Sequence, residues 1–279
     1  MSIDKVEVTN SRGNLLVLSL EDISNGYIVE DIDGLGPVKA TIVTSDFADM
    51  DGQQEQSSSR ETRNITLKLG YAPNFSINET VRVLRSRLYD YFMTATKVNL
   101  AFYMTDGLIV QTKGTVESCE PTLFAKEPQM DISIICFDPD FIDTETTEIH
   151  DLFTTIDTTP QVIQVNGSSK TGLSSLSFIA AKTMSEFTIY HTTPTGDVQT
   201  MLVSAPLLVG DVINLCTIKG QKSITLTRSG VTTSLLWAVS PQSIWVLLEP
   251  GPNQFYLSGT STGPSSPVLV EFKNRYGGL

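Results

Sequence analysis

The side chains best suited to acid–base or metal chemistry are few in this sequence and stand far apart. His150 and His191 are the only two histidines, and neither has a partner at the spacing of a zinc site or a catalytic triad. We therefore expect both histidines at the protein surface. Cys119, Cys136 and Cys216 are odd in number and form no C-x-x-C pair, which indicates unpaired thiols and synthesis in a reducing cytoplasm.

Loops that bind phosphate or metal ions are incomplete. Gly34 and Gly36 form a G-x-G without a third glycine or a following helical pattern, and residues 167–172 have the wrong order for a P-loop. Residues 49–52 resemble the start of a calcium loop but lack its later ligands and its closing glutamate. The sequence therefore predicts no enzyme activity, no cofactor and no metal site, and it favours a role in assembly or binding.

The charge is unevenly distributed along a chain that is long enough for two domains. Of the net charge of −12, residues 1–150 hold 24 acidic and 12 basic side chains, whereas residues 151–279 hold seven of each. An acidic half argues against a surface that binds nucleic-acid phosphates. No apolar run is long enough to span a membrane, and the first residues do not form a signal peptide, so we expect no membrane insertion.

One amphipathic helix is expected in the first half of the chain, from Ser76 to Met93. Ser76 and Glu79 have the spacing of a capping box. Runs with the alternating pattern of half-buried strands flank the helix at residues 65–69 and 98–104. The helix must pack an apolar stripe on their sheet. That stripe follows one face of a 3.6-residue repeat: Val81, Leu84, Leu88, Tyr91 and Phe92.

These patterns predict a mainly β protein with one helix. Residues 1–142 would form a barrel-like α+β domain, residues 143–159 a linker, and residues 160–279 a β-sandwich domain. The polar segment from Asp46 to Thr62 separates two good strands of the first domain, and we interpret it as the tip of a projecting hairpin that becomes ordered against a partner. The strands of the sandwich are expected at residues 161–165, 187–191, 200–204, 211–217, 223–227, 243–248, 253–258 and 267–272.

Several short motifs occur in a fixed order along the chain. The first half contains Gly34-Leu35-Gly36-Pro37-Val38-Lys39, Asp51-Gly52, Arg63-Asn64-Ile65, the helix with its arginines, and Cys136-Phe137-Asp138-Pro139-Asp140-Phe141. The second half contains Val209-Gly210-Asp211-Val212-Ile213, Gly220-Gln221-Lys222-Ser223-Ile224-Thr225-Leu226, and Leu248-Glu249-Pro250-Gly251-Pro252-Asn253. This order resembles that of the distal tail proteins (Dit) of long-tailed bacteriophages over nearly the whole chain.

The resemblance implies a galectin-like C-terminal sandwich and a homohexameric ring in the virion tail that joins the tail tube to the tip or baseplate. The implied partners are the tail tube protein and tail-tip hub or receptor-binding proteins for host attachment. Assembly would take place in the cytoplasm of the host bacterium. DNA would pass through an acidic channel without specific binding, because negative walls repel phosphates.

Our hypothesis for the hairpin is a clasp between subunits. Arg60 and Arg63 would then meet the acidic surface of the adjacent N-terminal domain. The expected interface residues are Gly52, Gln53, Gln54, Glu55, Arg60 and Arg63. The alternative function is a carbohydrate-binding adhesin module, in which Trp237 or Trp245 of the sandwich contacts sugar rings. Surface exposure of these tryptophans favours the adhesin, whereas a closed hexamer in solution favours the tail protein.

Overall fold

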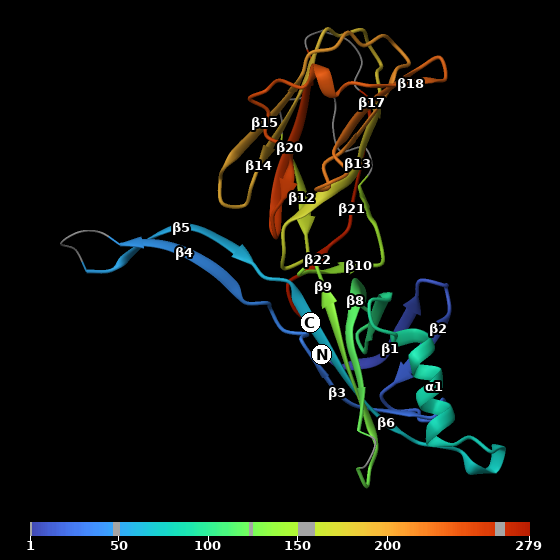
Figure 1. Cartoon of the computed structure of the whole chain (residues 1–279). Helices are drawn as coiled ribbons and strands as arrows, with labels where there is room; N and C mark the ends of the chain where they lie inside the picture. The colour runs from blue at the N-terminus through green and yellow to red at the C-terminus, as the bar shows by residue number, and fades with distance from the viewer. Residues whose placement is uncertain (1, 47–50, 123–124, 150–159, 260–265) are drawn as a thin grey trace. The chain divides into compact units, whose positions relative to one another are not determined.

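Two compact units make up the chain. The computed structural model describes residues 2–46, 51–122, 125–149, 160–259 and 266–279, coloured along the chain in Figure 1. Unit 1 contains the chain up to Thr144 together with Tyr276–Leu279, and unit 2 contains Glu145–Arg275. The last four residues therefore belong to the N-terminal unit, whereas the sequence analysis assigned them to the second domain.

Unit 1 is built on one antiparallel sheet in the order β2-β1-β7-β8-β9-β6-β3. Alternate residues of its strands are buried, and the strands expected at residues 65–69 and 98–104 are confirmed as β6 and β7. β10 (Phe141–Asp143) pairs with β8, and β22 (Arg275–Tyr276) pairs with β10. The strands of the main path are β1 (Ile3–Asn10), β2 (Leu15–Ser19), β3 (Tyr27–Asp33), β6 (Arg63–Tyr71), β7 (Lys97–Met104), β8 (Ile109–Pro121) and β9 (Gln129–Cys136).

Helix α1 (Val81–Phe92) packs on this sheet through the expected stripe, because Leu84, Leu88 and Phe92 are fully buried. The expected capping box is wrong. Thr80 caps the helix by accepting a hydrogen bond from the Val83 N–H at 3.4 Å. Ser76 lies instead in the short 3₁₀ turn η1 (Phe75–Ile77), which ends at a left-handed Asn78, so a helix cannot continue through it.

Leu84 is the first of the three buried residues of this stripe, and its truncation should destabilise unit 1. The side chain of Leu84 is fully buried, and a Cβ placed on Gly26 would lie 2.5 Å from its Cδ2 atom, so the surroundings are closely packed. Leu84→Ala should lower the free energy of unfolding by about 2–5 kcal/mol. Chemical denaturation measures it, with Val83→Ala on the exposed face as the control, which should change stability by less than about 1 kcal/mol. Equal effects of the two variants would contradict the packing.

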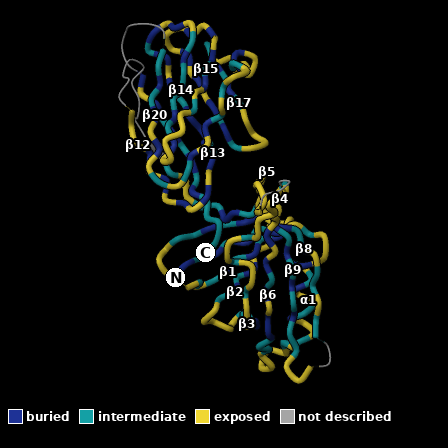
Figure 2. Tube along the Cα trace, turned by 90° about the vertical axis from the view of Figure 1, so that its left-hand side faces the viewer, coloured by how far each residue is buried: buried dark blue, intermediate teal, exposed yellow. Residues whose placement is uncertain are grey.

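Unit 2 is a sandwich of two antiparallel sheets, in the orders β11-β21-β13-β16-β17-β18 and β12-β20-β14-β15. The sheets share one core, where the Phe178 ring of β13 meets the Phe187 ring of β14 edge to face at 5.3 Å. Figure 2 shows the buried residues along these strands. The expected β-sandwich is confirmed. Its elements are β11 (Thr147–Ile149), β12 (Gln161–Val165), β13 (Thr171–Ile179), β14 (Phe187–Thr192), β15 (Val198–Val203), β16 (Val212–Cys216), β17 (Ser223–Arg228), β18 (Val231–Ser234), η2 (Leu236–Ala238), β19 (Leu247–Leu248), β20 (Gly251–Gly259) and β21 (Val268–Phe272).

Three expectations for this region differ from the structure. β13, which joins the two halves of its sheet, was not expected, and the strand expected at 243–248 is limited to Leu247–Leu248. Part of the expected linker is strand β11, which pairs with β21 and so belongs to the sandwich. The rest of that linker, residues 150–159, lies outside the described residues.

Candidate assembly arm

Unit 1 contains a two-stranded ribbon that takes no part in its hydrophobic core. β4 (Ala40–Asp46) and β5 (Gln53–Arg60) pair antiparallel with each other and with no other strand in the described chain (Figure 1). We call this ribbon the arm. Every residue of β5 is exposed, and in β4 only Ser45 is partly covered. The sequence analysis interpreted Asp46–Thr62 as the tip of a projecting hairpin. The structure confirms the hairpin and shows that most of this segment is strand β5, whereas ordering against a partner stays a prediction.

Side-chain hydrogen bonds run along the arm and connect its two strands. Gln56 donates to the Ser45 hydroxyl at 2.7 Å, and Thr44 donates to the Gln53 side chain at 2.8 Å. Gln53 in turn donates to the carboxylate of Asp46 at 2.8 Å. These polar residues lack the alternating apolar pattern from which strands are read, which is why the sequence did not reveal β5.

The apolar side chains of the arm are exposed to solvent. Ile42 and Val43 are 59% and 51% exposed. An isolated two-stranded ribbon is marginally stable in water, and it needs a hydrophobic face or a packing partner. The free edges of its strands also offer backbone donors and acceptors to another chain. We therefore expect the arm to become stably packed when it binds a partner.

The base of the arm is held by a fully buried arginine. Arg63, 1% exposed, uses all five guanidinium N–H groups on backbone carbonyls. Its Nε and Nη2 atoms donate to Pro139 at 2.9 and 2.7 Å, and Nη1 donates to Gly34 and, at 2.7 Å, to Gly36. The remaining N–H donates to Gly277 at 2.6 Å. One side chain thus joins the segment that enters β4, the turn before β10 and the C-terminal residues.

Close backbone contacts complete this base. Gly34 has a φ of +85°, and a Cβ at this position would lie 1.9 Å from the carbonyl oxygen of Asn64, so only glycine fits. The Leu279 N–H donates to the Leu35 carbonyl at 3.0 Å. The C-terminal residues therefore help to fix the segment from which the arm begins.

Arg60, at the end of β5, forms an ion pair within its own chain. Its Nη2 atom lies 2.9 Å from Oδ2 of Asp140, a carboxylate that is 2% exposed. This hydrogen bond raises the pKa of Arg60, whereas burial lowers the pKa of Arg63. The expectation that Arg63 meets a neighbouring subunit needs correction, whereas for Arg60 it stays a prediction. Arg63 is enclosed by its own unit, and Arg60 has an internal partner, although its side chain stays 44% exposed.

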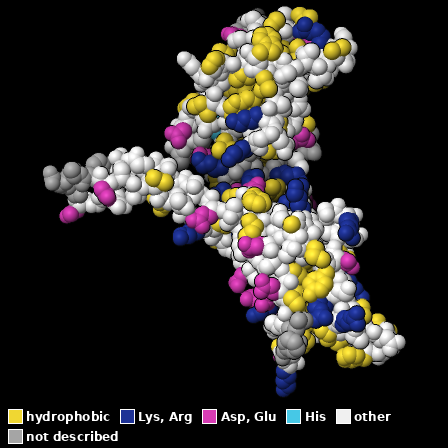
Figure 3. All heavy atoms as spheres, in the orientation of Figure 1, with side chains coloured by type: hydrophobic (Ala, Val, Ile, Leu, Met, Phe, Trp, Pro, Cys, Tyr) yellow, Lys and Arg dark blue, Asp and Glu magenta, His cyan; other side chains and the backbone are white. Residues whose placement is uncertain are grey.

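The other expected site residues lie as follows. Gly52, Gln53, Gln54 and Glu55 are exposed at the far end of the arm, where acidic side chains are visible in Figure 3, and a role in an interface stays a prediction for them. In unit 2, Trp237 is 73% exposed on η2. Trp245 is packed partly against the core, with Lys222 Nζ 5.1 Å from its ring centroid. His150 lies outside the described residues.

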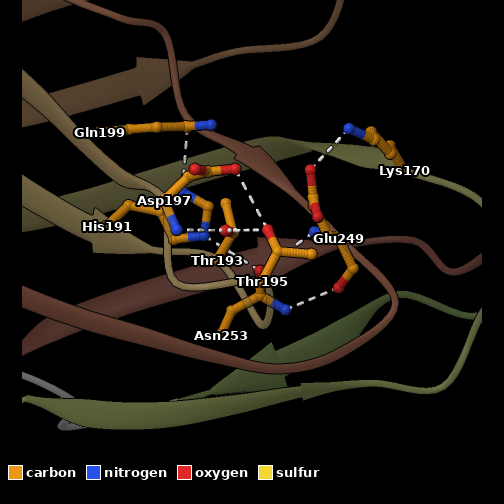
Figure 4. A network of polar contacts seen from close by, with 8 residues as sticks. All are labelled: Lys170, His191, Thr193, Thr195, Asp197, Gln199, Glu249 and Asn253. Atoms are coloured by element: carbon orange, nitrogen blue, oxygen red, sulfur yellow. Dashed lines mark hydrogen bonds and ion pairs between the residues drawn. The ribbon is translucent and has the colours of Figure 1, made fainter.

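His191 is fully buried, which contradicts the surface position expected for it. Figure 4 shows the network of polar contacts to which it belongs. Asn253 donates its amide hydrogens to two backbone carbonyls of the turn before it, so its Oδ1 atom must accept. That oxygen accepts the Glu249 N–H and lies 3.0 Å from His191 Nε2, which therefore carries a proton. His191 Nδ1 faces Gln199 at 3.1 Å. The network supports the turn between β19 and β20, and it forms no metal cluster with other described residues.

The thiols and the helices also offer no catalytic or membrane-spanning feature in the described chain. Cys119, Cys136 and Cys216 are unpaired. Burial raises the pKa of Cys119 to about 11, so this thiol stays protonated and unreactive at neutral pH. No helix in the described residues is long and apolar enough to cross a membrane.

Comparison with solved structures finds this fold in the Dit protein of phage SPP1, at 14% identity and a TM-score of 0.67, covering 97% of this chain and 98% of that chain. The activated baseplate of phage p2 matches at 12% identity over 99% of both chains, but its TM-score of 0.45 does not establish a shared fold. No protein-family model and no curated protein sequence matches the chain. The mainly β fold with one helix, a projecting hairpin and a terminal sandwich is therefore confirmed.

Proposed function

We propose that this chain is a structural protein of a phage tail tip, and that unit 1 assembles into a ring through the arm. The observation that carries the proposal is the arm itself: a solvated ribbon with exposed Ile42 and Val43, attached to a base that a buried arginine holds in place. Such a base orients the arm toward a partner, so less ordering entropy is lost on binding.

The likeness of the fold to SPP1 Dit supports this assignment. SPP1 Dit is described as a paradigm of the hub adsorption apparatus in phages that infect Gram-positive bacteria. By analogy, the present chain would be located in the virion tail, between the tail tube protein and tail-tip hub or receptor-binding proteins. Its assembly would take place in the host bacterial cytoplasm.

The acidic charge of unit 1 supports a channel that does not retain DNA. The edge strand β3 carries Glu30, Asp31 and Asp33, all exposed. Charged residues on an edge strand also prevent unwanted strand pairing. We assign these residues to the inner wall of the ring, where negative charge would repel the phosphates of passing DNA.

Mass measurement of the intact protein tests the ring. Multi-angle light scattering at rising protein concentration should give a closed oligomer of about six copies, because a head-to-tail contact that closes yields a single ring size. A monomer at all concentrations would refute the proposal. An open series of growing species would refute the closed ring while leaving self-association in place.

A carbohydrate-binding module is the second candidate, and the exposure of Trp237 favours it. A tryptophan that is 73% exposed on a β-sandwich offers a flat ring for stacking on a sugar. A glycan array probed with the intact protein and with Trp237→Ala distinguishes this function. Binding that depends on Trp237 would support it, and the absence of any glycan signal would remove it.

A further inference from the structure

A groove on unit 1 has the chemistry to receive the arm. It has a volume of about 560 Å³, and its lining includes Thr9, Lys97, Asn99, Lys113, Phe137 and Asp138. We call it the acceptor groove. Phe137 follows β9 and is 71% exposed, a large apolar side chain at the surface. Its burial needs a partner that brings apolar area.

The charge of the acceptor groove is opposite to that of the arm. Lys97 and Lys113 are exposed, and neither has an ion-pair partner within 4.0 Å among the described residues. Asp138 also lines the groove, so the two lysines leave it with a net positive charge. Between Lys39 and Arg60 the sequence of the arm contains no lysine or arginine, and its described acidic residues are Asp46, Asp51 and Glu55.

Basic side chains are scarce in this half of the chain, so a cluster of them indicates where a negatively charged partner would bind. Residues 1–150 hold half as many basic as acidic side chains. Two lysines that remain unpaired in such surroundings form a local site for negative charge. The other large group of cations, the arginines of α1, is partly neutralised, because Arg87 pairs with Glu79 at 2.9 Å.

The arm of the same copy cannot fill this groove while its strands stay paired. The root of the arm is held by Arg60 on Asp140, two residues after Asp138 of the groove. A strand of seven residues extends for roughly 20 Å at about 3.3 Å per residue. The acidic end therefore lies far from its own root, and its partner must be supplied by another molecule.

We propose that the acceptor groove binds the β4–β5 arm of a second copy of this chain, with Lys97 and Lys113 facing the acidic end of the arm and Phe137 packing against its apolar side chains. The contact is head-to-tail, since arm and groove are different surfaces, and repeated contacts of this kind close into a ring or continue as a filament. This inference rests on the proposed function and names the surface that accepts the arm.

Charge exchange tests this pairing by light scattering of the full chain. Glu55→Lys alone, and the double variant Lys97→Glu with Lys113→Glu, should each weaken self-association by about tenfold or more, because like charges then face each other. Combining the three substitutions in one chain should recover part of the loss. Arg82→Glu on α1 is the matched control, which changes charge by the same sign in the same unit and should leave the association unchanged.

Cross-linking between two different variants tests the contact directly. Glu55→Cys and Lys113→Cys proteins are mixed and treated with a short bismaleimide. A covalent dimer that forms in the mixture, and not in either protein alone, must join the arm of one copy to the groove of another. The native cysteines are present in all samples, so they are controlled for.

The outcomes separate this inference from the proposed function. Self-association that survives both charge reversals unchanged and gives no mixed cross-link overturns the acceptor groove but leaves arm-dependent assembly standing. If Arg82→Glu weakens association as much as the lysine reversals, the helix is the acceptor and the inference is wrong. A chain that stays monomeric overturns both.

Discussion

Replacing Arg63 with alanine should lower the free energy of unfolding of unit 1 by about 2–5 kcal/mol, a size typical of large-to-small substitutions in a packed interior. The guanidinium satisfies carbonyls of Gly34, Gly36, Pro139 and Gly277, and its Cζ atom lies 4.2 Å from the centroid of the Phe141 ring. Alanine removes all five donors at once. It leaves buried carbonyls without partners and a cavity where the guanidinium was.

Two variants serve as controls for this prediction. Arg63→Lys keeps the charge but presents only three donors without the planar fork, so it should recover only part of the loss. Arg82→Ala, at an exposed position of α1, should stay within about 0.5 kcal/mol of the parent. Urea denaturation followed by a probe in unit 1 measures all of them. If Arg63→Ala were as stable as Arg82→Ala, the five hydrogen bonds would have no energetic role.

Shortening the arm should strongly weaken assembly while leaving the fold intact. The register pairs Ile42 with Ser58, so replacing residues 43–57 by Asn-Gly closes a two-residue hairpin at that rung. Arg60 then keeps its ion pair with Asp140, and the base of the arm is unchanged. The variant should remain folded because the removed residues contribute nothing to the core of unit 1.

The expected loss in self-association is at least about a hundredfold, which corresponds to about 2.8 kcal/mol. Light scattering across a concentration series measures it, and circular dichroism and thermal melting of the same samples test the fold. A matched control replaces Ser57 and Ser58 by threonine, which keeps the length of the arm and favours strand structure. Rings that form as tightly from the shortened variant as from the parent would exclude the arm from assembly.

Local periodicity explains which elements could be read from the sequence. The alternation of Met130, Ile132, Ile134 and Cys136 predicts β9, and the helical spacing of Leu84, Leu88 and Phe92 predicts α1, since both depend on neighbours within a few residues. The order of short motifs also indicated the Dit fold, which the structure of SPP1 Dit matches.

Elements with weak periodicity were missed. β13 is rich in small polar residues such as Ser174, Ser175 and Ser177, and it becomes a strand because β16 and β21 pair with its two edges. β5 is polar throughout and exists through its pairing with β4. The partners of β13 lie far along the chain, so tertiary pairing overrides the local preference, whereas β5 is formed by hairpin pairing with the strand directly before it.

The sequence by itself determined that this protein is mainly β with one helix and a long polar segment, because these features depend on the types and spacing of nearby residues. Only the tertiary structure decided the roles of its polar side chains. His191 is buried because Asn253, 62 residues away, supplies its hydrogen-bond partner, and Arg63 is buried because carbonyls from three distant segments surround it. A charged group or an imidazole can be buried only where hydrogen-bond partners surround it. Those partners come from distant parts of the sequence, so only the folded chain brings them together.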